Sequence, residues 1–449
     1  MVKKKRLHSD NELISLSWPI FVELFLRVII GNINVLMISK YSESAVAAVG
    51  ASNQILNLTV FIFGFVSVGT QIIIAQLIGA KRRERIQSVI TTSLTAALVL
   101  GFLISAIFIF FSTYFLQWMQ LSPELVEIGA NYLKIFGGGM FLTSLTTTMI
   151  AIMRSHGFTK PALLVPLFAS IIAVIGNFFA LYGPFGLPVF GVAGMAVSSI
   201  VGNSVGLVIA IYLLHRHVRY RISFTNFKDF SFKNLKSVLS YGLPSSGEAL
   251  SYQAAQVVVT TIVATLGQDA LVAKSYVNAI TQFVSLAAAS LSQGTQIMIG
   301  RHVGAGEIDR AYHRGIRSVK IGVILSVVIT FLIWLFITPI MGVFTSSLTV
   351  LLIAKQVFLV DIFLEAGRAV NMILVGALNA SGDVKYPLIC SIIVLWIISL
   401  PFSYLLAIKF GLGLVGVWLA YAIDEILRSL LMLYRWKSDI WKSKFKLSD

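Results

Sequence analysis

Long apolar runs alternate with short polar or charged segments along almost the whole chain. A membrane-crossing helix needs about 20 predominantly apolar residues, and the polar breaks leave twelve stretches long enough to cross. Their limits are 13–39, 50–79, 88–112, 126–153, 162–182, 190–214, 237–266, 270–300, 316–343, 348–378, 386–408 and 412–434. The pattern therefore predicts an all-α polytopic membrane protein with twelve transmembrane helices.

The composition narrows the class of protein further. Of the 449 residues, 57% are hydrophobic and 12% charged, whereas about 25% of residues are charged in an average soluble domain. A soluble chain of this length could not bury so much apolar surface, because large cores split into domains. The single cysteine, Cys390, excludes a disulfide scaffold, and the apolar content excludes a disordered chain.

The Lys and Arg residues outside the predicted spans are concentrated on one side of the membrane. The formal net charge is +16, and 27 of the 35 Lys and Arg residues fall on the side of the N-terminus, whereas the opposite loops hold only Lys40 and Lys409. By the positive-inside rule, both termini are cytoplasmic in a multi-pass protein of the cell (inner or plasma) membrane. The charge then needs no nucleic-acid partner. The basic segments are an N-terminal tail at 1–12, a linker at 216–236 and a C-terminal tail at 437–449.

The two halves of the sequence repeat at a fixed offset of 225 residues. The matched positions include Pro19 and Pro244, Glu23 and Glu248, 69–72 and 294–297, Gly186 and Gly411, and Gly191 and Gly416. The halves, 13–215 and 237–436, each hold six spans and begin on the same side. They are therefore predicted to form two parallel six-helix bundles related by a pseudo-two-fold axis along the membrane normal, an arrangement suited to alternating access.

Several ionisable residues fall within the predicted spans, where they are costly unless paired or hydrated. Acid and base lie three or four residues apart, and so on one helical face, in the pairs Glu23 with Arg27, Glu365 with Arg368, and Glu425 with Arg428. Each pair can neutralise itself as a salt bridge, and the alternative is a functional role within the membrane. Asp424 has no assigned partner. Lys274, in the eighth span, is expected to extend toward the extracellular edge, and the alternative is that it pairs with the acids of the tenth span.

Glu248 differs because no cation lies within one helical turn of it. Its distance from Lys236 places it roughly 18 Å into the bilayer at 1.5 Å per residue, near the midplane. Such a carboxylate is suited to load and release a proton or a sodium ion. The alternative is a permanently protonated Glu248 that is hydrogen-bonded to Tyr252 or to a neighbouring helix.

A second group of polar residues follows one face of the tenth span. Asp361, Glu365 and Arg368 share that face, and Asn371 lies close to it. Two carboxylates and one cation leave a surplus negative charge, suited to a proton, sodium or a cationic substrate. The first-half equivalents of Glu365 and Arg368 are uncharged, so the group belongs to the second bundle alone.

The sequence shows no arrangement of catalytic residues. All six histidines fall in predicted cytoplasmic segments, and no zinc-ligand spacing, phosphate-binding loop or serine-nucleophile elbow is present. We therefore predict no enzyme activity, no metal site and no cofactor apart from the coupling proton or sodium ion.

Local patterns add a resemblance to a known family. They are 31–34 followed by 45–50, Gly69-Thr70-Gln71, 183–188 with 191–194, Gly242-Leu243-Pro244 with Glu248, and 376–383. With the two six-span halves, they resemble the multidrug and toxic compound extrusion (MATE) transporters, of the bacterial DinF-like type. The resemblance implies a V-shaped pair of bundles that exports small amphipathic, often cationic compounds in exchange for protons or sodium. The expected partners are that substrate and the lipid bilayer, with the protein a monomer.

Two departures from the family pattern determine which residues we expect to couple the ion. Asn34 stands where many bacterial members carry an Asp, and Arg368 stands where some place an acid. Both departures favour the second bundle, so the candidate cation-coupling residues are Glu248, Asp361, Glu365 and Arg368. The candidate substrate cavity comprises Tyr252, Gln256, Asn278, Asn371, Asn34, Asn177 and Glu23.

Other functions remain open at this point. A flippase for a lipid-linked precursor belongs to the same superfamily, but it would favour a strongly basic cleft, whereas the in-span cations here are few and mostly paired. A membrane enzyme or a non-transporting scaffold is the alternative from a different class. The missing catalytic residues argue against the enzyme, and the repeat with its mid-span acids argues against the scaffold.

Overall fold

The computed structural model describes residues 2–220 and 230–444, with side chains from Asp10 onward, and throughout these ranges it is helical without strands. The side chains of the basic run 3–6, together with Arg221, Lys228 and Lys446, lie outside the described residues. The charge distribution predicted from those positions stays a prediction.

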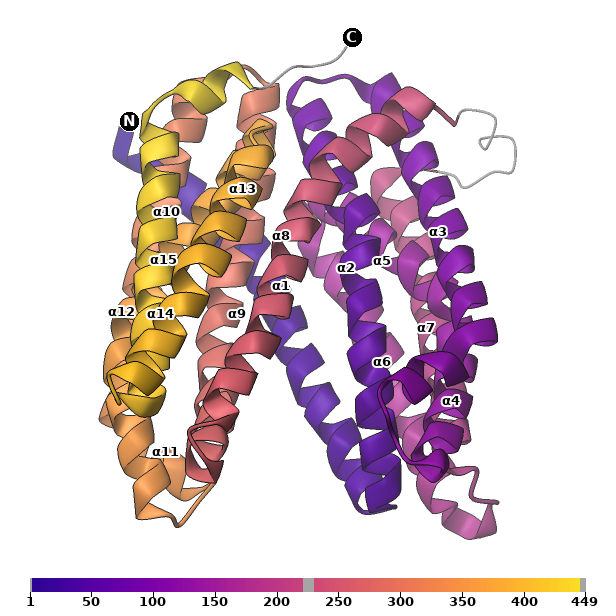
Figure 1. Ribbon diagram of the computed structural model, residues 1–449. Coiled ribbons are helices and arrows are strands. Elements are labelled where there is room, and N and C mark those ends of the chain that lie inside the picture. Colours follow the sequence, from indigo (N-terminus) through magenta and orange to yellow (C-terminus); the bar gives the residue numbers. More distant parts are fainter. Residues whose placement is uncertain (1, 221–229, 445–449) are drawn as a thin grey trace. The chain divides into compact units, whose positions relative to one another are not determined.

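The first half contains seven long or medium helices (Figure 1). They are α1 (Val2–Ser39), α2 (Glu43–Gly79), α3 (Arg83–Trp118), α4 (Pro123–Gly138), α5 (Met140–Ser155), α6 (Thr159–Tyr182) and α7 (Gly191–Leu213). The predicted fourth span is divided into α4 and α5, which meet at a 47° bend. Gly139 lies at the break and follows two further glycines, and glycine weakens a helix interior and so permits a bend there.

The second half repeats this order with more interruptions. Its elements are α8 (Phe232–Ala264), α9 (Gln268–Gly304), α10 (Ile308–Leu335), α11 (Ile337–Gly342), α12 (Leu348–Ser381), α13 (Lys385–Ile393), η4 (Val394–Ser399), α14 (Leu400–Tyr404), η5 (Leu405–Lys409) and α15 (Gly413–Lys437). The eleventh span is the run from α13 to η5, in which π-helical turns flank Pro401, a residue that cannot donate a backbone hydrogen bond. Each of the twelve predicted spans thus corresponds to one helix or to one continuous run, which confirms the fold class.

Apolarity alone identifies fewer of these spans. In the described part of the chain, seven helices are long and apolar enough to cross a membrane, or eight with the bent pair α4 and α5. The long helices that fail this test are α8, α9, α12 and α15, all in the second half. These helices contain Glu248, Lys274 and the charges of the tenth and twelfth spans, together with a high share of polar residues. The spans that look least like membrane helices therefore include all four candidate cation-coupling residues.

Contacts divide the chain into two units, which we call the C-unit (1–21 with 247–449) and the N-unit (Val22–Ser246). The division falls inside α1 and α8, shortly after Pro19 and Pro244. In the C-unit, Leu13 and Leu16 of α1 join a core that includes Met298 and Trp436. The limits 13–215 and 237–436, and the symmetry axis between them, stay predictions about the sequence repeat.

Glycines allow the first part of α8 to approach α2 closely within the N-unit. A Cβ on Gly69 would lie 2.0 Å from the carbonyl oxygen of Val238, and one on Gly242 would lie 1.8 Å from that of Phe65. The C-unit repeats the contact 225 residues later, where a Cβ on Gly294 would lie 2.2 Å from Ser17 Oγ of α1. The sequence repeat at these glycines therefore reflects a repeated helix contact.

Gly69→Ala is expected to destabilise the protein, because the new methyl group meets backbone atoms that cannot rotate away. Overpacking of this kind costs about 1–3 kcal/mol. Thermal unfolding in detergent would measure the loss. Gly50→Ala, on the same helix with nothing within 4 Å of the added Cβ, is the control. Equal melting temperatures for the two variants would contradict the close contact.

Candidate functional site

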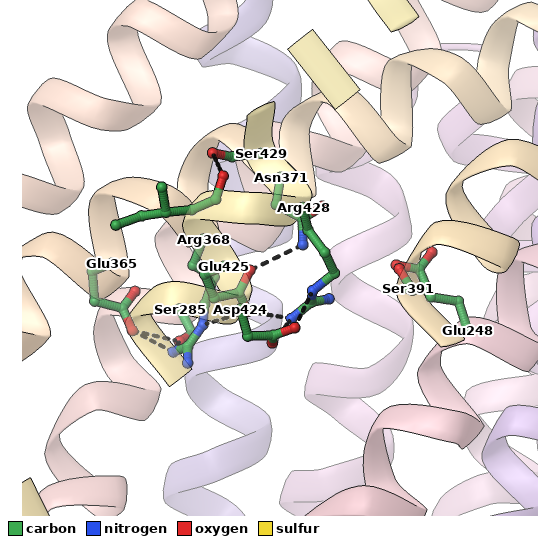
Figure 2. A network of polar contacts seen from close by, with 11 residues as sticks. Glu248, Ser285, Glu365, Arg368, Asn371, Ser391, Asp424, Glu425, Arg428 and Ser429 are labelled. Carbon is green, nitrogen blue, oxygen red and sulfur yellow. Dashed lines mark hydrogen bonds and ion pairs between the residues drawn. The ribbon is translucent and has the colours of Figure 1, made fainter. Parts of the chain in front are cut away.

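Two helices of the C-unit, α12 and α15, bring their in-span charges together in a buried network (Figure 2). Arg368 forms an ion pair with Glu365 one turn before it, as the spacing predicted. The same guanidinium lies 3.5 Å from Glu425 on α15. Ser285 of α9 accepts a hydrogen bond from Arg368, at 3.0 Å. Arg368 therefore joins three helices.

Arg428 is the second cation of this network. It donates to both carboxylate oxygens of Asp424, at 3.1 and 2.6 Å, and lies 2.9 Å from Glu425. The predicted pair of Glu425 with Arg428 is confirmed. The expectation that Asp424 has no partner is wrong, because a four-residue separation on α15 lets Arg428 bridge both acids.

The network has more acceptors than donors. Asn371 donates to Glu425 across 3.0 Å, and the Trp418 indole donates to Asp361 at the same distance. Among the described residues, one oxygen each of Asp361, Glu365 and Asn371 is buried without a hydrogen-bond partner. A buried acceptor without a donor is costly, so a bound proton or cation would be stabilised at these oxygens.

The net charge of the network also favours binding of a proton or cation. Glu365, Asp424 and Glu425 face two guanidinium groups, which leaves one excess negative charge when all are ionised. Asp361, one turn from Glu365, adds a second. The surplus acid that the sequence predicted for the tenth span is therefore present in the structure, and Glu425 of α15 extends it.

Glu248 lies apart from this network, on α8 (Figure 2). It is half-buried, and Ser391 of α13 donates a hydrogen bond to its carboxylate at 2.6 Å. Within the described residues, no Lys, Arg or His lies within ion-pair distance of Glu248. The carboxylate thus has a hydroxyl partner on a neighbouring helix and no neutralising cation.

The remaining C-unit candidates are not gathered at one point. Gln256 accepts a hydrogen bond from Tyr421 of α15 at 2.8 Å, and Tyr252 packs against the apolar core beside it. Asn278 is exposed on α9. Gln256 of α8 therefore contacts α15, and Tyr252, one turn before it on α8, packs in the apolar core of the C-unit. No polar contact between described residues joins Asn278 to the network. The roles of all three as cavity residues stay predictions.

The N-unit candidates form two separate polar contacts. Glu23 is buried, and it pairs with Arg154 of α5 as well as with Arg27, which lies 3.5 Å away. The Asn34 and Asn177 side-chain amides hydrogen-bond to each other, 3.1 Å apart. The sequence interpretation missed Arg154, because its position suggested a cytoplasmic loop cation although α5 continues through it.

Arg154→Met is expected to destabilise the protein more than Arg27→Met does. The Arg154 side chain is 12% exposed, whereas that of Arg27 is 56% exposed. An exposed ion pair contributes about 0–1 kcal/mol, while removing a buried partner leaves an uncompensated charge. Thermal unfolding of the two variants in the same detergent provides the comparison. A lower melting temperature for Arg27→Met would contradict the assignment.

Lys274 corrects another expectation. Its side chain is 5% exposed and donates to Thr260 of α8 at 2.6 Å, so it does not extend to the membrane edge. The interpretation as an extended lysine was wrong, because Thr260 provides a partner inside the C-unit. That partner is 14 residues away, beyond any single-helix pattern.

Among the described residues, no group of three or more His, Cys, Asp or Glu side chains could hold a metal ion. The carboxylates of the site instead have guanidinium, hydroxyl, amide or indole partners, as described above. This arrangement suits transient binding of a proton or a monovalent ion to one or two carboxylates.

Comparisons with known proteins give the same family over most of the chain. The family model MatE matches residues 19–179 and 244–405. The chain is 37% identical over 441 residues to the uncharacterized transporter YisQ of Bacillus subtilis, covering 98% of this chain and 97% of that protein. It is 24% identical over 439 residues to the probable multidrug resistance protein NorM of Thermotoga maritima, covering 98% and 94%.

A solved structure shows the same fold. It is that of a MOP superfamily transporter from Pyrococcus furiosus, for which a reversed polarity of the binding pocket suggests a different function. The TM-score is 0.89 at 21% sequence identity, covering 98% of this chain and 97% of that one. The two matched segments of the family model begin at Pro19 and Pro244, the prolines of the sequence repeat.

Proposed function

Because the chain belongs to the MatE family, we propose that it is a secondary active antiporter that exports small amphipathic, often cationic, organic compounds by alternating access. A proton or sodium gradient drives the export. The names of relatives such as the probable multidrug resistance protein NorM support this substrate class. The membrane character of the fold supports a multi-pass protein, and the proposed location is the cell membrane with both termini cytoplasmic.

One observation carries the proposal. Glu248 is a half-buried carboxylate in a span, with a hydroxyl donor and no ion-pair partner among the described residues. A mid-span charge left without a counter-ion is unfavourable, so binding of a proton or sodium ion there stabilises the state that contains it. Release on the other side of the membrane then favours the alternative state, and the gradient sets the direction.

The network beyond Glu248 is proposed to assist coupling. Asp361 and Glu365 each present a buried carboxylate oxygen without a hydrogen-bond partner among the described residues. Arg368 holds Glu365 in place by an ion pair and neutralises one charge of the network, so the surplus falls to two negative charges when all the carboxylates are ionised. Asn371 fixes Glu425 on the neighbouring helix. A cationic substrate and the coupling ion would compete for this negative charge, which is the requirement for exchange.

The other proposals follow from the same class of protein. The partners are a small-molecule substrate and the lipid bilayer, without nucleic acid, and the protein is a monomer without catalytic activity. A flippase for a lipid-linked precursor is not favoured, because Arg368 and Arg428, the two arginines of the network, are already paired with carboxylates and are not free to bind a pyrophosphate.

Dye transport in proteoliposomes tests the function. A panel of cationic and neutral amphipathic dyes is loaded, and a pH gradient and a sodium gradient are imposed separately. We expect one of the two gradients to drive accumulation of cationic dyes against their own gradient. Accumulation of no dye under either gradient, with translocation of a lipid-linked pyrophosphate probe, would replace the antiporter with the flippase.

A further inference from the structure

The sequence repeat includes a tripeptide that the proposed function does not use. Phe185-Gly186-Leu187 recurs 225 residues later as Phe410-Gly411-Leu412. The first, in the N-unit, lies in the connection from α6 to α7, and the second, in the C-unit, lies in the connection from η5 to α15. We call them the two apolar tips.

Both tips expose large apolar side chains. Phe185 is 94% exposed and Phe410 is 71% exposed, and the two leucines are also exposed. A single exposed apolar residue is ordinary on a protein surface, but a repeated group of them indicates an interaction site. Two independent units that expose the same side chains at the same repeat position indicate a shared environment.

The backbone holds these side chains outward. Gly186 and Gly411 have positive φ values of 79° and 69°, and nothing lies within 4 Å of a Cβ at either position. Phe185 itself adopts a left-handed conformation, with φ 62°. This backbone conformation is unfavourable for a residue with a side chain. The turn nevertheless adopts it, and the Phe185 ring is left exposed.

Each tip continues an exposed apolar surface of its own unit. Phe178 and Phe179 near the end of α6 are exposed, and so are Val189 and Phe190 directly after the first tip. In the second unit, exposed Phe402, Tyr404 and Leu405 precede the tip. Segment 183–190 has no charged residue, and the cation Lys409 directly precedes Phe410. An apolar group flanked by a cation fits the boundary between acyl chains and phosphates.

From these observations we propose that the two tips insert into the interface of the membrane leaflet opposite the N-terminus, one anchor for each unit. Phe185 and Leu187 anchor the N-unit, and Phe410 and Leu412 anchor the C-unit. The occupant of this surface is lipid rather than a protein, because both tips continue exposed apolar surfaces of helical runs that are long and apolar enough to cross a membrane, and a cation precedes the second tip. Each anchor fixes the depth of its own loop and is independent of the substrate and the coupling ion.

Spin labelling in lipid nanodiscs tests the anchors. Cys390 is the single cysteine, so Cys390→Ser provides the background. Nitroxide labels are attached after Phe185→Cys or Phe410→Cys, and after Gln268→Cys as the control. Gln268 is an exposed polar residue at the start of α9. Power saturation then compares collisions with oxygen, which partitions into lipid, and with a water-soluble nickel chelate.

We expect oxygen to relax the labels at both tips more than the nickel chelate does, and the reverse at Gln268. Labels at the tips that match Gln268 would overturn the proposal. Low access to both reagents at the tips, with dipolar broadening between labels, would also overturn it and indicate contact between copies. If a Phe variant does not give monodisperse protein, labels at Leu187→Cys and Leu412→Cys provide the same measurement. Each leucine lies two residues after the phenylalanine of its tip.

Discussion

Glu248→Gln is expected to abolish gradient-driven export of cationic dyes while leaving the protein folded in the membrane. The amide has the size of the carboxylate, and its oxygen still accepts the hydrogen bond from Ser391. It cannot take up and release a proton, and it provides no charge for sodium. Transport under an imposed pH or sodium gradient in proteoliposomes should therefore fall to the level of vesicles without protein.

Two controls separate coupling from folding. Glu307→Gln changes a carboxylate in the loop between α9 and α10, where hydrogen bonds from Arg310 and then His302 hold the pKa of Glu307 below its usual value. This carboxylate is charged and lies outside the spans, so we expect wild-type transport. Ser391→Ala removes the hydrogen-bond donor but keeps the Glu248 carboxylate, so coupled transport should persist with a changed ion affinity. Normal exchange by Glu248→Gln would move the coupling site to Asp361 and Glu365.

The sequence predicts the spans well because a bilayer imposes a length and an apolarity on each helix. The bend between α4 and α5 was not predicted, since a glycine run permits a bend without requiring one. The same holds for the division of α1 and α8 between two units. Pro19 and Pro244 mark the positions, but the partner of each helix end depends on tertiary packing.

The candidate site divides in the same way. Contacts three or four residues apart on one helix, such as Glu365 with Arg368, follow from helical geometry and were predicted. Contacts between distant segments were not, including Ser391 with Glu248 across 143 residues and Arg154 with Glu23 across 131 residues. A single sequence contains no signal for such pairs, because serine and arginine occur at many positions that the repeat does not distinguish.

Arg428→Met is expected to cause a large loss of stability. Arg428 makes two hydrogen bonds to Asp424 and contacts Glu425, and all three side chains are buried. Removing one partner of a buried ion pair costs about 3–5 kcal/mol. Glu425 keeps Arg368 at 3.5 Å, whereas Asp424 loses both of its hydrogen bonds. Thermal unfolding and the yield of monodisperse protein in detergent measure the effect.

The matched control is Arg310→Met, which removes an exposed arginine from its pair with Glu307. An exposed pair of this kind contributes little to stability, so the melting temperature of Arg310→Met should stay near the wild-type value. The double variant Asp424→Asn with Arg428→Met should recover much of the lost stability, because the acid that depended on Arg428 is then neutral. If the double variant is as unstable as Arg428→Met alone, the loss arises from packing and not from charge. Recovery would instead show that the ion pair of Asp424 with Arg428 stabilises the fold. The carboxylates available to the coupling ion would then be Glu248, Asp361 and Glu365.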